Sequence, residues 1–206
     1  MSTTIILVRH GQTEWNRIER FRGRYDVPLN NVGLKQANKS AKFIGMRWKP
    51  AAIYTSPLSR AVQTAESIAK VCNLLVRPTS GIIDIDYGDW QGLTPDEVKK
   101  KWPELLSDWY ERPETVQIPG GETLSKVRNR AMAVLREICL LHSDQEIVLV
   151  SHTVVNRLIL LTTLGLGDDR FWHLGQEPCA INVIEKRGEE YIVQAMNCTS
   201  HLHKNS

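Results

Sequence analysis

The stretch Ile5-Ile6-Leu7-Val8-Arg9-His10-Gly11 decides how the rest of the chain is organised. Its four consecutive apolar residues, three of them β-branched, predict a buried strand. The strand ends in a cation, an imidazole and a glycine, residue types that carry chemistry rather than fill a core. We therefore expect a functional site where this strand ends.

A second stretch repeats the arrangement late in the chain, where Ile147-Val148-Leu149-Val150 runs directly into Ser151-His152. In open α/β sheets the carboxyl ends of neighbouring parallel strands share one edge, and ligands bind there. If the two strands are neighbours, His10 and His152 converge.

The composition fits a single domain over residues 1–206 with one sizeable core. The chain is 42% hydrophobic and 24% charged, and its formal net charge is +3. Because the 26 lysines and arginines are scattered along a nearly balanced chain, a nucleic-acid partner is not expected.

Cysteine usage and the lack of targeting patterns predict a cytoplasmic protein. The four cysteines form no C-x-x-C pair, which favours reduced thiols over disulfides or a zinc site. The chain begins with a predicted strand instead of a secretory signal. No apolar run approaches the ~20 residues that a membrane span needs, so no membrane contact is expected.

Helical and strand patterns alternate along the chain. They predict a three-layer α/β/α sandwich with a mostly parallel mixed sheet that is antiparallel at one edge. Ser56 is the expected N-cap of a helix that starts at Pro57. Besides the two strands above, the expected elements are helices over 33–48 and 57–70, a long helix through 127–138, a helix over 154–164, a strand over 51–55, and a hairpin over 180–193.

A small helical cap is expected as an insertion over about residues 88–120. The capping box Thr94-Pro95-Asp96-Glu97 starts one helix, and Trp102-Pro103 separates it from a second that ends near Tyr110.

Several reactive side chains are expected at the carboxyl edge of the sheet. The helix that follows His152 also points its free N–H groups there, which favours an anion. Arginine pairs beside a helix amino terminus are typical of phosphate recognition. The side chains expected at this edge are Arg9, His10, Ser56, Arg60, Asp84, Asp86 and His152.

Histidine in such a setting allows two phosphate chemistries. It acts as a general base for water or serine, or it is itself the nucleophile and forms a phosphohistidine. A zinc site is the competing hypothesis, but the flanking arginines repel a cation and no H-x-x-x-H pattern is present.

These residues resemble the histidine phosphatase superfamily, in its phosphoglycerate mutase-like branch. The strand followed by R-H-G-(E/Q)-(S/T)-x-W-N is the most specific motif, and the resemblance spans nearly the whole chain. The matching blocks are Leu7–Asn16, Thr55–Ala65, Asp84–Gly92, Pro119–Thr123 and Val150–His152.

The resemblance implies a role for each matching residue. His10 is the phosphorylated nucleophile, and Asp84 is the proton donor. Thr153 offers its backbone N–H, and no metal or other cofactor is implied. The phosphate pocket would consist of Arg9, Asn16, Arg60 and His152.

Three further residues are predicted to bind substrate. Arg22 and Gly23 lie in the polar loop that leaves the catalytic edge, and His201 lies in the polar tail.

The chain departs from the family pattern at two positions. The proton donor is typically glutamate, and here it is Asp84, one methylene shorter, which leaves Asp86 as an alternative donor. Thr153 replaces a glycine, which changes the pocket floor but keeps the N–H.

The resemblance further implies a phosphatase rather than a mutase. Only 31 residues lie between Gly88 and Gly120, where the mutases carry a longer insertion. The blocks Ser151–Val154, Phe171-Trp172 and Asn197–Leu202 look similar to those of the metal-independent phosphoserine phosphatases. The expected partner is therefore a small phosphorylated metabolite such as phosphoserine.

Two alternative functions stay open, a phosphoglycerate mutase and a non-catalytic phospho-ligand binder, the latter because of the aspartate at 84. Family members are often dimers through a sheet edge, so a homodimer through the Val183/Ile192 hairpin is a further expectation.

Overall fold

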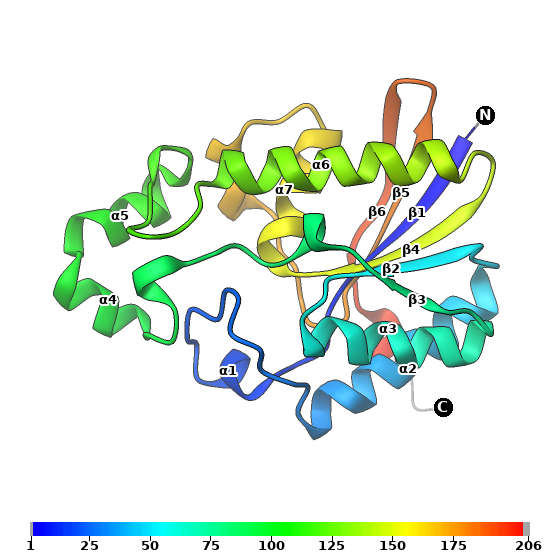
Figure 1. The fold of residues 1–206 in the computed structure, drawn as a ribbon, viewed down its shortest axis with the longest axis horizontal. Coiled ribbons are helices and arrows are strands. Elements are labelled where there is room, and N and C mark those ends of the chain that lie inside the picture. The colour runs from blue at the N-terminus through cyan, green and yellow to red at the C-terminus, as the bar shows by residue number, and fades with distance from the viewer. Residues whose placement is uncertain (1, 204–206) are drawn as a thin grey trace.

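The computed structural model describes residues 2–203, which form a six-stranded mixed sheet between helices (Figure 1). The strand order is β3-β2-β4-β1-β5-β6, and only the pairs formed by β5 are antiparallel. The strands are β1 (Ser2–Arg9), β2 (Ala52–Thr55), β3 (Val76–Pro78), β4 (Glu146–Ser151), β5 (Ile181–Arg187) and β6 (Glu190–Cys198).

The first strand, β1, lies between β4 and β5 in the middle of the sheet. Ile5 and Leu7 pack into one cluster of buried side chains, while Ile6 and Val8 pack into a second. Successive side chains of a strand point to opposite faces, so both faces of β1 are covered and an unbroken apolar run is required.

Helices cover both faces of the sheet, with α6 and α7 on one side and α2 and α3 on the other (Figure 1). The predicted three-layer sandwich with one antiparallel edge is therefore confirmed. The α-helices are α1 (Glu14–Arg17), α2 (Asn31–Arg47), α3 (Ser59–Cys72), α4 (Pro95–Lys101), α5 (Pro103–Glu111), α6 (Leu124–Leu141), α7 (Thr153–Thr163) and α8 (Ser200–His203).

Helix α3 begins later than its sequence predicts. Its N-cap is Leu58, and Ser56 lies outside the helix. The hydroxyl of Ser56 lies 2.7 Å from Nε2 of His152, so the oxygen expected to cap the helix hydrogen-bonds to His152 at the carboxyl edge of the sheet instead.

The inserted segment projects beyond the sheet at one end of the molecule, where Figure 1 shows α4 and α5. The capping box at Thr94 is formed as predicted. Trp90 and Trp109 are buried and belong to the same cluster as Leu7. The cap therefore packs on the core of the sheet domain. Short 3-10 turns complete the chain, namely η1 (Ser80–Ile82), η2 (Gly88–Trp90), η3 (Pro113–Thr115) and η4 (Asp168–His173).

Among residues 2–203, no helix has both the length and the apolar character required to cross a membrane.

Candidate active site

The two strand ends with histidines meet, as predicted. β1 and β4 are parallel neighbours, and Arg9 is in register with Ser151. The next residues, His10 and His152, have ring centroids 5.1 Å apart, and both rings are buried.

His10 presents a neutral imidazole with a defined tautomer. Its Nδ1 lies 2.7 Å from the carbonyl oxygen of Gly11, so Nδ1 carries the proton and Nε2 keeps the lone pair. Burial lowers the pKa of His10 well below its ordinary value, and the charges of Arg60, Arg9 and Arg22 add to this. Nε2 is therefore available as a nucleophile at neutral pH.

Arg60 is fully buried beneath the site and is held by the polar loop that follows α1. Its guanidinium donates to the carbonyl oxygens of Tyr25 and Gly23 at 2.8 Å each, and to Oδ2 of Asp84 at 3.0 Å. The loop and the acid together fix the direction of this cation.

Arg9 faces the same site and is anchored by the backbone carbonyl of Gln176. Burial, followed by the charge of Arg22, lowers the pKa of Arg9 to about 9. The guanidinium still carries its proton at neutral pH, so it remains a cation for an anionic ligand.

Gly23 positions Arg60 through its backbone. It does not line the cleft, and its contribution is the carbonyl that accepts from Arg60. Its φ is +51°, and a Cβ there would collide with the Gln91 side chain and the Ile85 carbonyl. The loop needs a glycine here to turn that carbonyl toward Arg60, while the predicted contact of Gly23 with substrate stays a prediction.

The two candidate proton donors lie in different places. Asp84 lines the cleft, and its Oδ2 is 3.5 Å from Nδ1 of His152. Asp86 points away, since Oδ1 accepts from the N–H of Gly88 and Oδ2 pairs with Arg24 at 3.3 Å. The geometry therefore favours Asp84 despite its shorter side chain.

His152 sits at the amino terminus of α7 and is its N-cap residue, without a side-chain capping bond. Burial lowers the pKa of His152 well below its ordinary value, and Arg60 lowers it further. Thr153 is the first residue of α7 and lines the cleft. The free N–H groups of this helical turn are therefore directed at the site.

Arg9, Asp84 and Thr153 line a cleft of about 330 Å³. His10, Arg60 and His152 are buried and are not among its lining residues. The predicted residues Asn16 and Arg22 line it, and the amide oxygen of Asn16 is engaged by Thr13. The further lining residues are Glu19, Arg20, Phe21, Tyr87, Pro95, Trp109, Tyr110, Val154, Arg157, Phe171, Trp172 and Gln176.

Unsatisfied polar atoms gather around this cleft. Within residues 2–203, nine buried side-chain nitrogens and oxygens have no hydrogen-bond partner. Five of them belong to the site, namely Nε of Arg9, Arg22 and Arg60, Nδ1 of His152 and Oγ1 of Thr153. Because buried polar groups are normally paired, such a concentration of unpaired donors is typical of an anion-binding site.

The structure does not bring His201 to the cleft. Its ring is buried against α2, with Nε2 2.9 Å from the hydroxyl of Ser40, and it stacks on Phe43. Packing against α2 thus holds this part of the tail away from the cleft, and the predicted contact of His201 with substrate stays a prediction.

Sequence reasoning missed some of the residues around the cleft, among them Arg157 and Gln176. Arg157 lies four residues after Thr153 in α7, and that spacing puts both on one helix face. Gln176 anchors Arg9 through its backbone, which no sequence pattern signals.

No metal cluster is evident in the part of the chain that the structure describes, where no three His, Cys, Asp or Glu side chains are grouped to hold an ion.

Comparison with known proteins places the chain in a family. The model described as histidine phosphatase superfamily (branch 1) matches residues 5–199. Phosphoserine phosphatase 1 of Hydrogenobacter thermophilus is 38% identical over 198 residues, which cover 96% of this chain and 93% of that protein. The metal-independent phosphoserine phosphatase of Arabidopsis thaliana is 34% identical over 203 residues, 97% of this chain and 83% of that protein.

A solved structure, YhfR of Bacillus stearothermophilus, superimposes with a TM-score of 0.94 at 28% identity, covering 98% of this chain and all of the other. The two strand-end histidines, the three arginines Arg9, Arg22 and Arg60, and these matches lead to one conclusion. The chain belongs to branch 1 of the histidine phosphatase superfamily.

Proposed function

We propose that this phosphoric monoester hydrolase cleaves phosphoserine through a phosphohistidine at His10, without a metal. The observation that carries the proposal is the neutral imidazole of His10. Its Nδ1 is bound to the carbonyl of Gly11, and three arginines lie close enough to lower its pKa. Two relatives named phosphoserine phosphatase, one of them metal-independent, support the substrate and the cofactor assignment.

In the first step Nε2 of His10 attacks the phosphorus atom in line with the ester oxygen. The P–N bond forms as the P–O bond breaks, and the electron pair of that bond leaves with the oxygen of serine. Arg9, Arg22 and Arg60 neutralise the charge on the equatorial oxygens, together with the N–H groups at the start of α7.

Asp84 protonates the departing oxygen. Its carboxylate pairs with Arg60 in this structure, and a phosphate dianion bound at Arg60 would displace it. In the second step water attacks the phosphorus atom of phospho-His10 while the carboxylate of Asp84 accepts a proton from it. The new P–O bond forms as the P–N bond breaks, which releases phosphate and restores the lone pair on Nε2 of His10.

Three organisational proposals accompany this function. The chain forms one domain, supported by the buried cluster that the cap shares with the sheet. It works in the cytoplasm, supported by four free cysteines in the described residues. It pairs through the β5–β6 edge, supported by exposed Ile192 and Met196 on the last strand.

The test is a rapid-quench experiment with phosphoserine in the presence of EDTA. We expect release of phosphate, and an acid-labile phosphoprotein whose label maps to His10. Loss of turnover in EDTA, or steady turnover without any labelled protein, would contradict the mechanism. Phosphoserine binding with no turnover from acid to neutral pH would favour the non-catalytic alternative.

The mutase alternative is tested with 3-phosphoglycerate. We expect phosphate release to exceed formation of 2-phosphoglycerate, because two relatives of the chain are named phosphoserine phosphatases. The opposite ratio would overturn the assignment as a hydrolase.

A further inference from the structure

Arg157 lines the cleft and has no carboxylate partner among the described residues. It is partly buried on α7, and its Nε donates to the carbonyl oxygen of Leu174 at 2.6 Å. Its guanidinium carbon lies 4.9 Å from the ring centres of both Phe171 and Trp172. Among residues 2–203, no acidic side chain forms an ion pair with it.

These contacts fix the guanidinium without using its whole donor set. Arginine has five N–H donors, and the Leu174 carbonyl takes the one on Nε. The aromatic rings are themselves held, since Trp172 donates from Nε1 to the carbonyl of Trp109 at 2.6 Å. The two terminal nitrogens of Arg157 are therefore positioned in advance to bind an anion.

The charges along the cleft point to a ligand with two anionic groups. Of the other lining arginines, Arg20 pairs with Glu97 at 3.3 Å, while Arg9 and Arg22 belong to the phosphate site. Once a phosphate has engaged that site, Arg157 is still without an anion. A partly buried cation without a partner is costly unless the ligand supplies one.

We propose that Arg157 binds a carboxylate of the substrate, so that the enzyme selects phosphomonoesters of small hydroxy acids. This assignment rests on the proposed function and names the residue that gives it its substrate class. Thr153 and Arg157 lie one turn apart on α7, which corresponds to a rise of about 6 Å. Phosphoserine and 3-phosphoglycerate separate phosphate from carboxylate by only an ester oxygen and a two-carbon link, a spacing of that order.

Four substrates test the proposal in wild type and in Arg157→Gln. Phosphoserine and 3-phosphoglycerate carry the carboxylate, whereas phosphoethanolamine and glycerol phosphate lack it. We expect kcat/KM to fall roughly 10- to 100-fold for the first two in the variant, the size expected for a charge-assisted hydrogen bond. For the other two substrates kcat/KM should stay near the wild-type value, which also shows that the variant is folded.

The loss should appear in KM, while inhibition by inorganic phosphate stays unchanged, because the phosphate site is intact. Arg157→Lys should recover part of the loss by keeping the charge. Arg170→Gln is the matched control, since Arg170 is an exposed arginine near the same wall that pairs with Asp169 outside the cleft.

An equal fall for all four substrates, or a weaker inhibition by phosphate, would overturn the role of Arg157 and leave the phosphatase assignment standing. Failure of the wild-type enzyme to hydrolyse any of the four would overturn both.

Discussion

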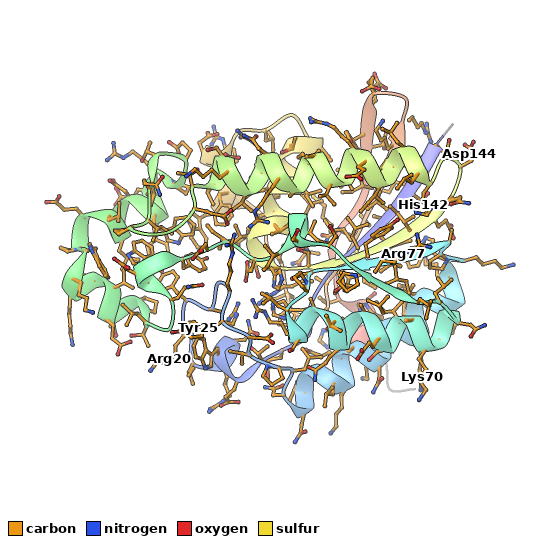
Figure 2. The ribbon with its side chains drawn as sticks, in the orientation of Figure 1. Arg20, Tyr25, Lys70, Arg77, His142 and Asp144 are labelled. Atoms are coloured by element: carbon orange, nitrogen blue, oxygen red, sulfur yellow. The ribbon has the colours of Figure 1, made fainter. Side chains whose placement is uncertain are left out.

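Buried histidines lie in two clusters at opposite ends of the sheet, and the clusters differ in how their polar atoms are paired. The carboxyl-edge cluster contains His10 and His152, and the amino-end cluster consists of His142, Tyr54 and Gln145. His10 and His152 occupy the carboxyl edge, and His142 lies near the amino end of β4. Figure 2 shows His142 and Arg77 at the far end of the molecule from Arg20, which lines the cleft. Nδ1 of His142 lies 2.7 Å from Oε1 of Gln145. Its Nε2 lies 2.9 Å from the hydroxyl of Tyr54, whereas Nδ1 of His152 has no hydrogen-bond partner.

The difference shows where this fold gains stability and where it gives stability up. Around His142 every hydrogen bond of the ring is formed within the chain, which is the usual state of a buried polar side chain. Around His10, three arginines are crowded together, and their charges lower the pKa of the imidazole they surround. Such an arrangement is unfavourable until an anion binds, and it is therefore the mark of the functional cluster.

Removal of the nucleophile should have the largest effect and tests the comparison most directly. His10→Ala should lose about four orders of magnitude or more in kcat, because the proposed phosphoenzyme forms on His10. The measurement is turnover of an aryl phosphate, checked by mass spectrometry for a phosphorylated chain. Retained turnover would show that the carboxyl-edge cluster is not catalytic.

Removal of the acid Asp84 should lower kcat less than removal of His10 does, and it should strengthen the binding of inorganic phosphate. Asp84→Asn should lower kcat by about 10²- to 10⁴-fold, the usual contribution of general acid catalysis. The same variant should bind inorganic phosphate more tightly, since Arg60 no longer pairs with a carboxylate.

Asp86→Asn is the control for Asp84, because Asp86 pairs with Arg24 away from the cleft. It should leave kcat unchanged. Asp84→Glu should remain active, because the longer side chain is the one typical of the family. A larger loss in Asp86→Asn than in Asp84→Asn would reverse the assignment of the donor.

The amino-end cluster should respond in stability and not in activity. His142→Ala leaves the hydroxyl of Tyr54 without this partner and should lower the free energy of unfolding by about 1–3 kcal/mol. Urea denaturation measures the loss, and kcat/KM of the folded fraction should be unchanged. A fall in kcat/KM with unchanged stability would mean that the two clusters are not separate in function.

The sequence predicts this contrast only in part, and the reasons are physical. β1 and β4 are recognisable because strands covered on both faces must be apolar throughout, so the polar residues at their ends stand out. The approach of His10 to His152 follows from the rule for parallel strand ends.

Other features depend on tertiary contacts that leave no local pattern. Ser56 satisfies the sequence rule for an N-cap, but its hydroxyl is taken by His152. His201 lies in a polar tail, and only its packing on Phe43 of α2 shows that it is held away from the site. Gly23 acts through its carbonyl on Arg60, a contact between distant parts of the chain.

The smallest expected effect is a pH dependence of stability that separates the buried site histidines from an ordinary histidine. Burial first, and then Arg60, lower the pKa of His10 and His152 well below the value of about 6.5 that applies in the unfolded chain. Below that pH the unfolded chain binds protons that the folded chain does not, so the free energy of unfolding falls as the pH decreases. Each histidine contributes a slope of at most about 1.4 kcal/mol per pH unit, from about pH 6.5 down to its folded pKa.

His10→Gln should therefore lose stability less steeply than wild type between about pH 6.5 and 5, as measured by urea denaturation at each pH. Equal slopes for the two proteins would show that His10 is free to take up a proton in the folded state, which is incompatible with a neutral nucleophile held among arginines.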